Sequence, residues 1–188
     1  MKKHMISAAI GLLAIACTQA PEPCPPQQES PAVGFNNLVE DFPGAEMGSQ
    51  SDVDIWLKYL EYLNAKDLEG LATLQADSIE VHTANGRYIK GAEAHRAALS
   101  EWIYDTDATW KPVWGTAIRQ AGGDTTGSFV MAVSDMTVRD GEETRRVNNM
   151  FTVWIKDSKV QAFWFFKRDF TQKELDMIEA AEAAEAQE

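Results

Sequence analysis

Between residues 51 and 102, apolar side chains recur at the helical period. The first run of such positions is Val53, Trp56, Leu60 and Leu63. Their spacing predicts an amphipathic helix with one buried face. Ser51, followed by Asp54 three positions later, matches a helix N-cap with a carboxylate in the first turn. Asp67 is placed to cap a short second helix, and a third helix is predicted after Gly91.

The second half of this region alternates apolar and polar positions, which is the pattern of half-buried strands. Four long strands are predicted, at residues 109–119, 128–138, 145–156 and 159–168. An earlier hairpin, 78–83 with 87–89, turns at Asn85-Gly86. Helices followed by strands indicate an α+β domain. We expect three helices to cover a strongly curved, mostly antiparallel sheet, with a cavity between the two layers.

Composition divides the 188 residues into four segments. Six of the seven prolines lie between Pro21 and Pro43, whereas all six tryptophans lie between Trp56 and Trp164. A proline-rich stretch without aromatic residues buries too little surface to offset the entropy of ordering it. The predicted segments are a signal peptide at 1–16, a disordered tether at 17–50, the folded domain at 51–170 and an acidic helix or tail at 171–188.

The N-terminus has the features of a bacterial secretion signal. Lys2 and Lys3 precede an apolar run that is too short to span a bilayer as a helix. The segment Leu13-Ala14-Ile15-Ala16-Cys17 resembles a lipobox, which implies that Cys17 is lipidated and becomes the N-terminus. Thr18, instead of an aspartate, follows the cysteine and favours the outer membrane as the location. Ordinary secretion with cleavage at another site is the alternative.

Charge and motif content exclude several classes of protein. The net charge is −12 and no basic stripe exists, so nucleic acid is excluded as a partner. The sequence has no glycine-rich phosphate loop, no Ser/His/Asp order and no Cys/His metal spacing. With Cys17 lipidated, Cys24 has no intrachain partner, so a disulfide framework is excluded as well. We therefore predict no metal and no cofactor.

Two segments resemble a known superfamily. One is NAKDLEGLATLQADSIEVHTANGRYIKGAEAHRAAL, from Asn64 to Leu99, and the other is FTVWIKDSKVQAFWFF, near the end of the domain. Both are similar to nuclear-transport-factor-2-like proteins of the SnoaL-like polyketide cyclase branch. The resemblance spans about residues 52–170 and implies a cone-shaped α+β fold with a pocket. It implies no single activity, because the superfamily includes isomerases, dehydratases, cyclases and non-catalytic binders.

The catalytic set of the ketosteroid isomerases in this superfamily is not present. In those relatives the set consists of a carboxylate base near the end of the first strand, a carboxylic acid on the penultimate strand and a tyrosine on the first helix. The base position falls on Thr83 and the acid position on Phe151. Tyr59 or Tyr62 could supply the tyrosine, but a lone donor does not make that active site.

Two histidines are candidates for acid–base chemistry. His95 stands on the apolar face of the third helix, where the family usually has an aliphatic residue. The structural alternative is a buried histidine bonded to a backbone carbonyl. Alternation places His82 on the face of its strand opposite to Val81 and Thr83, outside the cavity. A register slip of one residue would instead pair His82 with His95 as a dehydratase-like set.

On the penultimate strand, Asn149 is a polar residue on an otherwise apolar face. It could orient a ligand carbonyl or hydroxyl, or it could bond to a neighbouring loop. The predicted pocket residues are Trp56, Tyr59, His95, Trp102, Asn149 and Phe151. Lys167 and Arg168, at the end of the last strand, are interpreted as rim charges paired with Asp169.

The leading hypothesis is a membrane-tethered pocket protein that binds a small apolar or amphipathic molecule, with no assigned reaction. The first alternative is a lyase- or isomerase-type enzyme that uses His95, assisted by Tyr59, Tyr62 or His82. The second is an interaction module that docks a partner through the outer face of the sheet. The last strand is aromatic on both faces. A homodimer is therefore expected through the sheet face that bears either Trp154 and its strand neighbours or the alternate residues of the last strand, because such a face would otherwise remain exposed to water.

Overall fold

The computed structural model describes residues 32–34, 36, 40–123 and 127–187, all within the unit 31–188. The predicted signal peptide, Cys17 and Cys24 lie outside the described residues. The helices are α1 (Gln50–Asn64), α2 (Leu68–Leu74), α3 (Ala92–Thr106) and α4 (Gln172–Glu185). The strands are β1 (Ala45–Met47), β2 (Gln75–His82), β3 (Tyr88–Lys90), β4 (Thr109–Gln120), β5 (Ser128–Asp140), β6 (Glu143–Lys156) and β7 (Lys159–Asp169).

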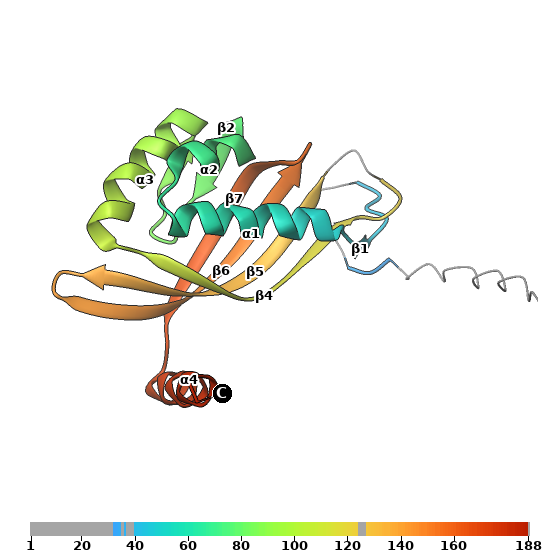
Figure 1. The fold of residues 1–188 in the computed structure, drawn as a ribbon. Coiled ribbons are helices and arrows are strands. Elements are labelled where there is room, and N and C mark those ends of the chain that lie inside the picture. The colour runs from blue at the N-terminus through green and yellow to red at the C-terminus, as the bar shows by residue number, and fades with distance from the viewer. Residues whose placement is uncertain (1–31, 35, 37–39, 124–126, 188) are drawn as a thin grey trace, which may run out of the picture. The chain divides into compact units, whose positions relative to one another are not determined.

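The seven strands form one curved, unclosed sheet in the order β1-β4-β5-β6-β7-β2-β3. Neighbouring strands are antiparallel except β2 and β7, which are parallel. Helices α1, α2 and α3 cover one face of this sheet (Figure 1). The predicted α+β architecture, with three helices on a curved and mostly antiparallel sheet, is confirmed.

The core lies between α1 and the inner face of the sheet. On α1, the buried residues are Trp56, Tyr59, Leu60 and Leu63. On β6, alternate residues from Val147 to Ile155 are buried. The buried face of α1 and the buried face of β6 therefore point toward each other. Removing these apolar side chains from water stabilises the domain.

Helix α1 begins before the predicted position. Ser49, not Ser51, is the N-cap, and its hydroxyl oxygen accepts a hydrogen bond from the Asp52 backbone N–H at 3.3 Å. Asp67 caps α2 as predicted, because its carboxylate accepts from the Gly70 N–H at 2.8 Å. Both caps satisfy backbone donors that have no partner within the helix.

The interpretation of residues 17–50 as a disordered tether is wrong for its last part. Residues Ala45 to Met47 form β1, which pairs with β4 through Ala45↔Gln120 and Met47↔Ile118. This strand covers an edge of β4 that would otherwise leave backbone N–H and C=O groups without partners. Composition could not reveal it, because the pairing depends on a strand more than seventy positions away in the sequence.

The outer face of the sheet, which the first three helices leave uncovered, carries many apolar side chains. Met150 lies opposite Phe166, and Trp154 lies opposite Ala162, on this face. The exposed large residues on or beside the sheet are Met47, Tyr88, Val113, Trp114, Phe129, Met150 and Phe166. The two alternative faces considered for a dimer, that of Trp154 and that of the alternate residues of the last strand, are one and the same surface.

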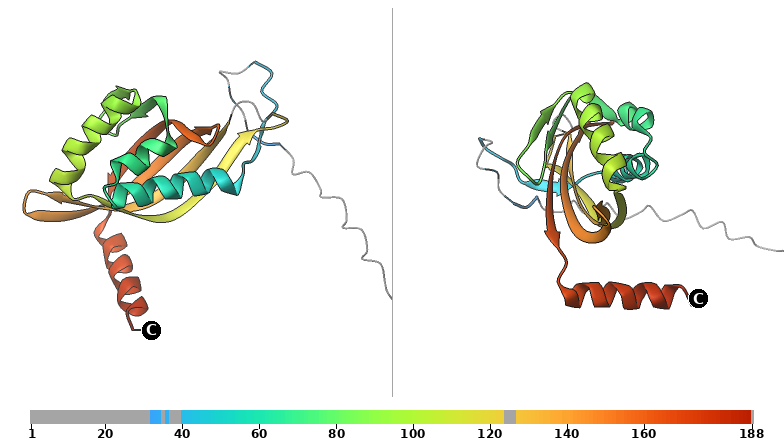
Figure 2. Two further views of the ribbon diagram at one scale, coloured as in Figure 1. Left: turned by 45° about the horizontal axis from the view of Figure 1, so that its top comes forward. Right: turned by 90° about the vertical axis from the view of Figure 1, so that its left-hand side faces the viewer.

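Helix α4 lies on the opposite side of the sheet from α1 to α3, as both views of Figure 2 show. It begins with a capping box, in which Thr171 and Glu174 each accept from the backbone N–H of the other. It buries none of its residues. The Arg146 guanidinium joins the helix to the sheet, because it donates to Glu182 at 3.1 Å and also to Asp135.

Within the described part of the chain, no helix combines the length and the apolar character needed to cross a bilayer.

Candidate functional site

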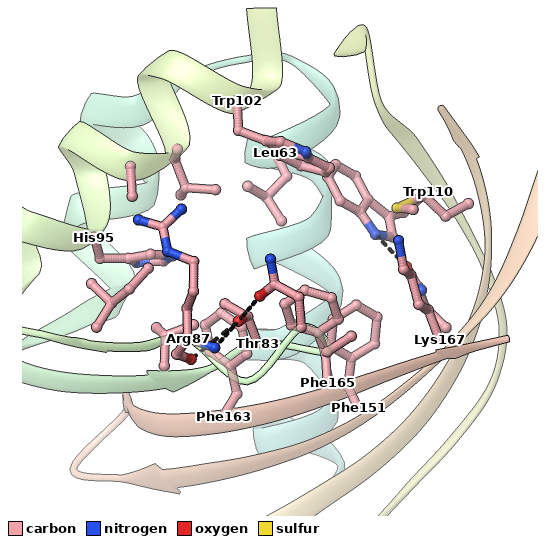
Figure 3. A pocket seen from close by; sticks show the side chains of 18 of the residues that line it. Leu63, Thr83, Arg87, His95, Trp102, Trp110, Phe151, Phe163, Phe165 and Lys167 are labelled. Atoms are coloured by element: carbon pink, nitrogen blue, oxygen red, sulfur yellow. Dashed lines mark hydrogen bonds between the residues drawn. The ribbon is translucent and has the colours of Figure 1, made fainter. Parts of the chain in front are cut away.

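A cavity of about 210 Å³ lies between the helices and the inner face of the sheet. This volume is large enough for a small organic molecule and not merely for one or two waters. Figure 3 looks into the cavity, with His95 and Arg87 on one side and Trp110 and Lys167 on the other. All six predicted pocket residues line it, namely Trp56, Tyr59, His95, Trp102, Asn149 and Phe151.

Aromatic rings form the floor. The ring centroids of Trp56 and Tyr59 are 5.1 Å apart in a stacked arrangement, and Trp56 lies 4.9 Å from Phe151. Phe163 of β7 completes this cluster at 5.7 Å from Trp56. Aromatic side chains from α1, β6 and β7 thus pack against one another here, which gives the cavity a rigid apolar floor.

Tyr59 is fully buried, and its hydroxyl oxygen accepts a hydrogen bond from the Gln75 amide at 3.3 Å. Burial strongly raises the pKa of this phenol above its ordinary value. The hydroxyl therefore remains protonated at neutral pH and is already engaged on the side of Gln75.

His95 reaches the cavity from the first turn of α3. Gly91, at φ +93°, allows the chain to turn sharply into this helix. The imidazole is only 2 % exposed, and its centroid lies 5.6 Å from that of Phe163. Burial lowers the pKa of His95 to about 4, so the side chain is neutral at pH 7. Its Nδ1 atom is buried without a hydrogen-bond partner among the described residues.

Asn149 is a buried polar group on the sheet side of the cavity. Its Oδ1 accepts a hydrogen bond from the indole Nε1 of Trp110 at 3.1 Å. Its Nδ2 is buried and has no partner within the described residues, and the same holds for the Nε1 of Trp56. Two donors and one imidazole nitrogen are thus left unpaired in the walls of an apolar cavity, where buried polar groups are normally hydrogen-bonded.

The rim is formed by the β2–β3 turn, the end of β7 and the side of α3. In the turn, the Thr83 hydroxyl donates to Asn85 and accepts from the Arg87 N–H at 2.9 Å, so it is used locally. Arg87 and Lys167 are exposed residues that line the opening. Trp102 is 37 % exposed, and its ring centroid lies 5.8 Å from that of Trp110.

His82 lies on the opposite face of β2 and is not among the cavity-lining residues. Its ring stacks on Trp164 at 5.0 Å and also contacts Tyr88. The register that places Val81 inside and His82 outside is therefore the observed one. The hypothesis of a His82–His95 pair is wrong, because His82 packs on Trp164 on the outer face of the sheet, whereas His95 packs on Phe163 on the inner face.

The structure also corrects the charges at the end of β7. Arg168 pairs with Glu174 at 2.7 Å, and Asp169 pairs with Arg145 at 2.8 Å. Lys167 forms neither interaction and faces the cavity. Strand alternation explains this difference, because Lys167 shares the inner face with Phe163 and Phe165 whereas Arg168 lies on the outer face.

Sequence reasoning did not identify several lining residues, among them Trp110, Phe163 and Arg87, and it interpreted Lys167 as a rim charge but paired it with Asp169. Alternation along β7 could have placed Phe163 inside together with Lys167. Trp110 and Arg87 carried no such signal, because each lies at the boundary of an element. Groups of three His, Cys, Asp or Glu side chains suited to a metal ion do not occur in the described ranges.

The comparisons with known proteins identify the fold. No protein-family model matches the sequence, and no curated protein matches it. A ketosteroid isomerase-type protein of Kribbella flavida has a TM-score of 0.54 and 14% identity, covering 67% of this chain and 84% of its own. A LEH-like epoxide hydrolase of M. tuberculosis has a TM-score of 0.53 and 11% identity, covering 64% and 84%.

A SnoaL-like polyketide cyclase-type protein of Shewanella denitrificans has a TM-score of 0.53 and 9% identity, with 64% of this chain and 92% of its own covered. These similarities concern the fold alone, because the identities are low. The chain has a nuclear-transport-factor-2-like, pocket-containing fold. Proteins with this fold perform different reactions, so the activity must be argued from the cavity itself.

Proposed function

We propose that this protein is a membrane-tethered binding protein whose cavity holds a small apolar or amphipathic molecule. The observation that carries the proposal is the combination of an aromatic floor with unpaired buried polar atoms. Apolar walls with a few convergent polar groups are typical of small-molecule sites. Unpaired buried donors cost free energy unless a ligand or water satisfies them.

The polar atoms favour a ligand that carries a hydrogen-bond acceptor. The Trp110 bond holds the amide of Asn149 so that Nδ2, a donor, remains unpaired. The Nε1 of Trp56 is a donor as well. A carbonyl, ether or hydroxyl oxygen of the ligand would satisfy these donors, and neutral His95 could supply either a donor or an acceptor.

Binding is tested with the neutral fluorescent probe N-phenyl-naphthylamine and a pair of matched variants on α3. Ala98 lines the cavity, whereas Ala97, its neighbour, is exposed. Ala98→Trp fills the cavity and is expected to weaken probe binding about tenfold or more, which corresponds to about 1.4 kcal/mol. Ala97→Trp is expected to bind like the wild type. Failure of the wild type to bind the probe, or equal binding by both variants, contradicts the proposal.

The membrane tether is proposed from the lipobox resemblance at Cys17, and the outer membrane is the proposed location. Acyl chains on this cysteine would give stable anchoring, since each buried methylene contributes about 0.8 kcal/mol. Cys17→Ser is expected to abolish processing or release the protein from membranes. Cys24→Ser is the matched control and should fractionate like the wild type. A Cys17→Ser protein that keeps the wild-type mature mass and stays with membranes contradicts the tether.

The partner we propose for the outer sheet face is a second copy of the chain. Trp114 and Phe166 on this face are 56 % and 54 % exposed, and Met150 lies beside Phe166. Contiguous apolar surface of this kind marks interaction sites in soluble proteins. A two-fold dimer would cover the same patch on both copies.

The lyase- or isomerase-type alternative with His95 as acid or base receives less support. Its assisting groups are not in place, because His82 is on the other face of β2 and the Tyr59 hydroxyl is bonded to Gln75. His95 would have to act without either of them. A His95→Leu variant that retains ligand binding but loses turnover of a discovered substrate would establish the enzymatic alternative in place of simple binding.

A further inference from the structure

We infer that the ligand of this cavity is an organic anion, with an apolar body among the aromatic residues and a carboxylate at the rim near Arg87 or Lys167. The inference rests on the proposed binding function and specifies the chemical class of the ligand. It is carried by the placement of charges around the opening.

The lining contains two cations, and none of its described residues is an aspartate or a glutamate. This is notable in a chain with a net charge of −12. Arg87 comes from the β2–β3 turn and Lys167 from the end of β7, so two separate elements bring positive charge to the cavity from its two sides (Figure 3). An opening lined by one sign of charge attracts ligands of the other sign.

Both cations also lack carboxylate partners within the ranges that the structure describes. Most other cations of the domain do have such partners, and these are Lys58, Lys66, Lys90, Arg96, Lys111, Arg119, Arg139, Arg145, Arg146 and Arg168. Neighbouring residues show the contrast: Arg168 pairs with Glu174, but Lys167 is unpaired and faces the cavity. The charges of Arg87 and Lys167 are thus available to a ligand.

The interior determines where the charged group of the ligand lies. The floor is aromatic, and the imidazole of His95 is buried among apolar side chains. An ionised carboxylate in such surroundings would lose its hydration without gaining a countercharge. The carboxylate therefore stays at the exposed rim, where a guanidinium or ammonium group can form a charge-assisted hydrogen bond with it. The apolar body extends inward to the floor.

The experiment compares decanoate with decanol, which have the same chain length and differ in head-group charge. Binding is followed by tryptophan fluorescence, since Trp56, Trp102 and Trp110 line the cavity, and by calorimetry. The test variant is Arg87→Gln/Lys167→Gln. The control variant, Lys156→Gln/Lys173→Gln, removes the same charge from two cations outside the cavity for which the described residues offer no carboxylate partner.

We expect the wild type and the control variant to bind decanoate at least about tenfold more tightly than decanol. In the test variant this preference is expected to disappear while decanol binding is unchanged. The preference should also fall with added salt, because the rim charges are exposed.

Equal binding of both ligands by the wild type, or a preference that survives in the test variant, overturns the inference. In either case decanol and N-phenyl-naphthylamine would still bind, so the proposed function would stand. A protein that binds neither of these neutral molecules would instead overturn the proposed function.

Discussion

The indole Nε1 of Trp110 donates a hydrogen bond to the Oδ1 of Asn149 across 3.1 Å, joining the start of β4 to the middle of β6 inside the cavity. Asn64 of α1 holds the same tryptophan from its backbone side, because its amide bonds both the N–H and the carbonyl of Trp110. The orientation of the Asn149 amide is thereby fixed before a ligand arrives, which lowers the entropic cost of binding.

Trp110→Phe is expected to lower the free energy of unfolding by about 1–2 kcal/mol, because it leaves the buried Asn149 carbonyl oxygen without a donor. Trp102→Phe is the matched control, since Trp102 lies on the rim and no hydrogen bond of its indole is found among the described residues. Its cost should be about 0.5 kcal/mol or less. Urea unfolding monitored by circular dichroism measures both. Equal losses in the two variants would contradict the role of the Trp110–Asn149 bond.

His95 makes stability depend on pH. Burial lowers the pKa of the folded imidazole to about 4, whereas the unfolded value is about 6.5. Between these values the unfolded chain binds one proton more than the folded chain, so the free energy of unfolding falls as the solution is acidified through this window. The full effect is about 3 kcal/mol.

His95→Leu is expected to remove this contribution, so that the variant gains stability relative to the wild type on going from about pH 7 to about pH 4. Urea unfolding at both values of pH gives the difference between the two proteins. An NMR titration, with the His95 resonance identified by its absence from the variant, measures the pKa directly. A folded pKa near 6.5 would contradict both the burial of the imidazole and its placement in the cavity.

Arg146 is expected to matter more for the sheet than for α4. Asp135 is almost fully buried and accepts from Arg146, which also donates to the more exposed Glu182. Arg146→Met leaves the Asp135 carboxylate without its partner and should cost about 2–4 kcal/mol. Glu182→Gln affects only the more exposed ion pairs of Glu182 with Arg146 and Lys111 and should cost about 1 kcal/mol or less. Thermal unfolding compares the two variants, and similar losses would show that Asp135 does not depend on Arg146.

Met150→Asp is expected to dissociate the proposed dimer, since it places a charge in the centre of the outer sheet face. Met177→Asp is the matched control, because Met177 is 64 % exposed and belongs to α4, not to a strand of the sheet. Sedimentation of the detergent-solubilised protein should give a dimer for the wild type and the control, and a monomer for Met150→Asp. A monomeric wild type at tens of micromolar would rule out the dimer.

The sequence by itself determined the helices, the long strands and the inward faces of these strands. The boundaries of the four long strands were predicted to within about two residues, because each strand alternates over ten or more positions and ends at a turn signal. Asn149 and Phe151 could be placed on one face of their strand for the same reason, and His95 was placed by the helical spacing of apolar residues on α3. Local patterns of this kind depend only on neighbours in the chain, and they are read directly from it.

Only the tertiary structure decided which of these faces meet. The parallel pairing of β2 with β7, the addition of β1 to the edge of β4 and the bond between Trp110 and Asn149 all join residues that are distant in sequence. Arg87 and Lys167 have no sequence signal in common, yet sheet curvature brings both to one opening. Such contacts follow from the closure of long loops and the twist of the sheet, which depend on the packing of the whole domain and leave no local period in the sequence.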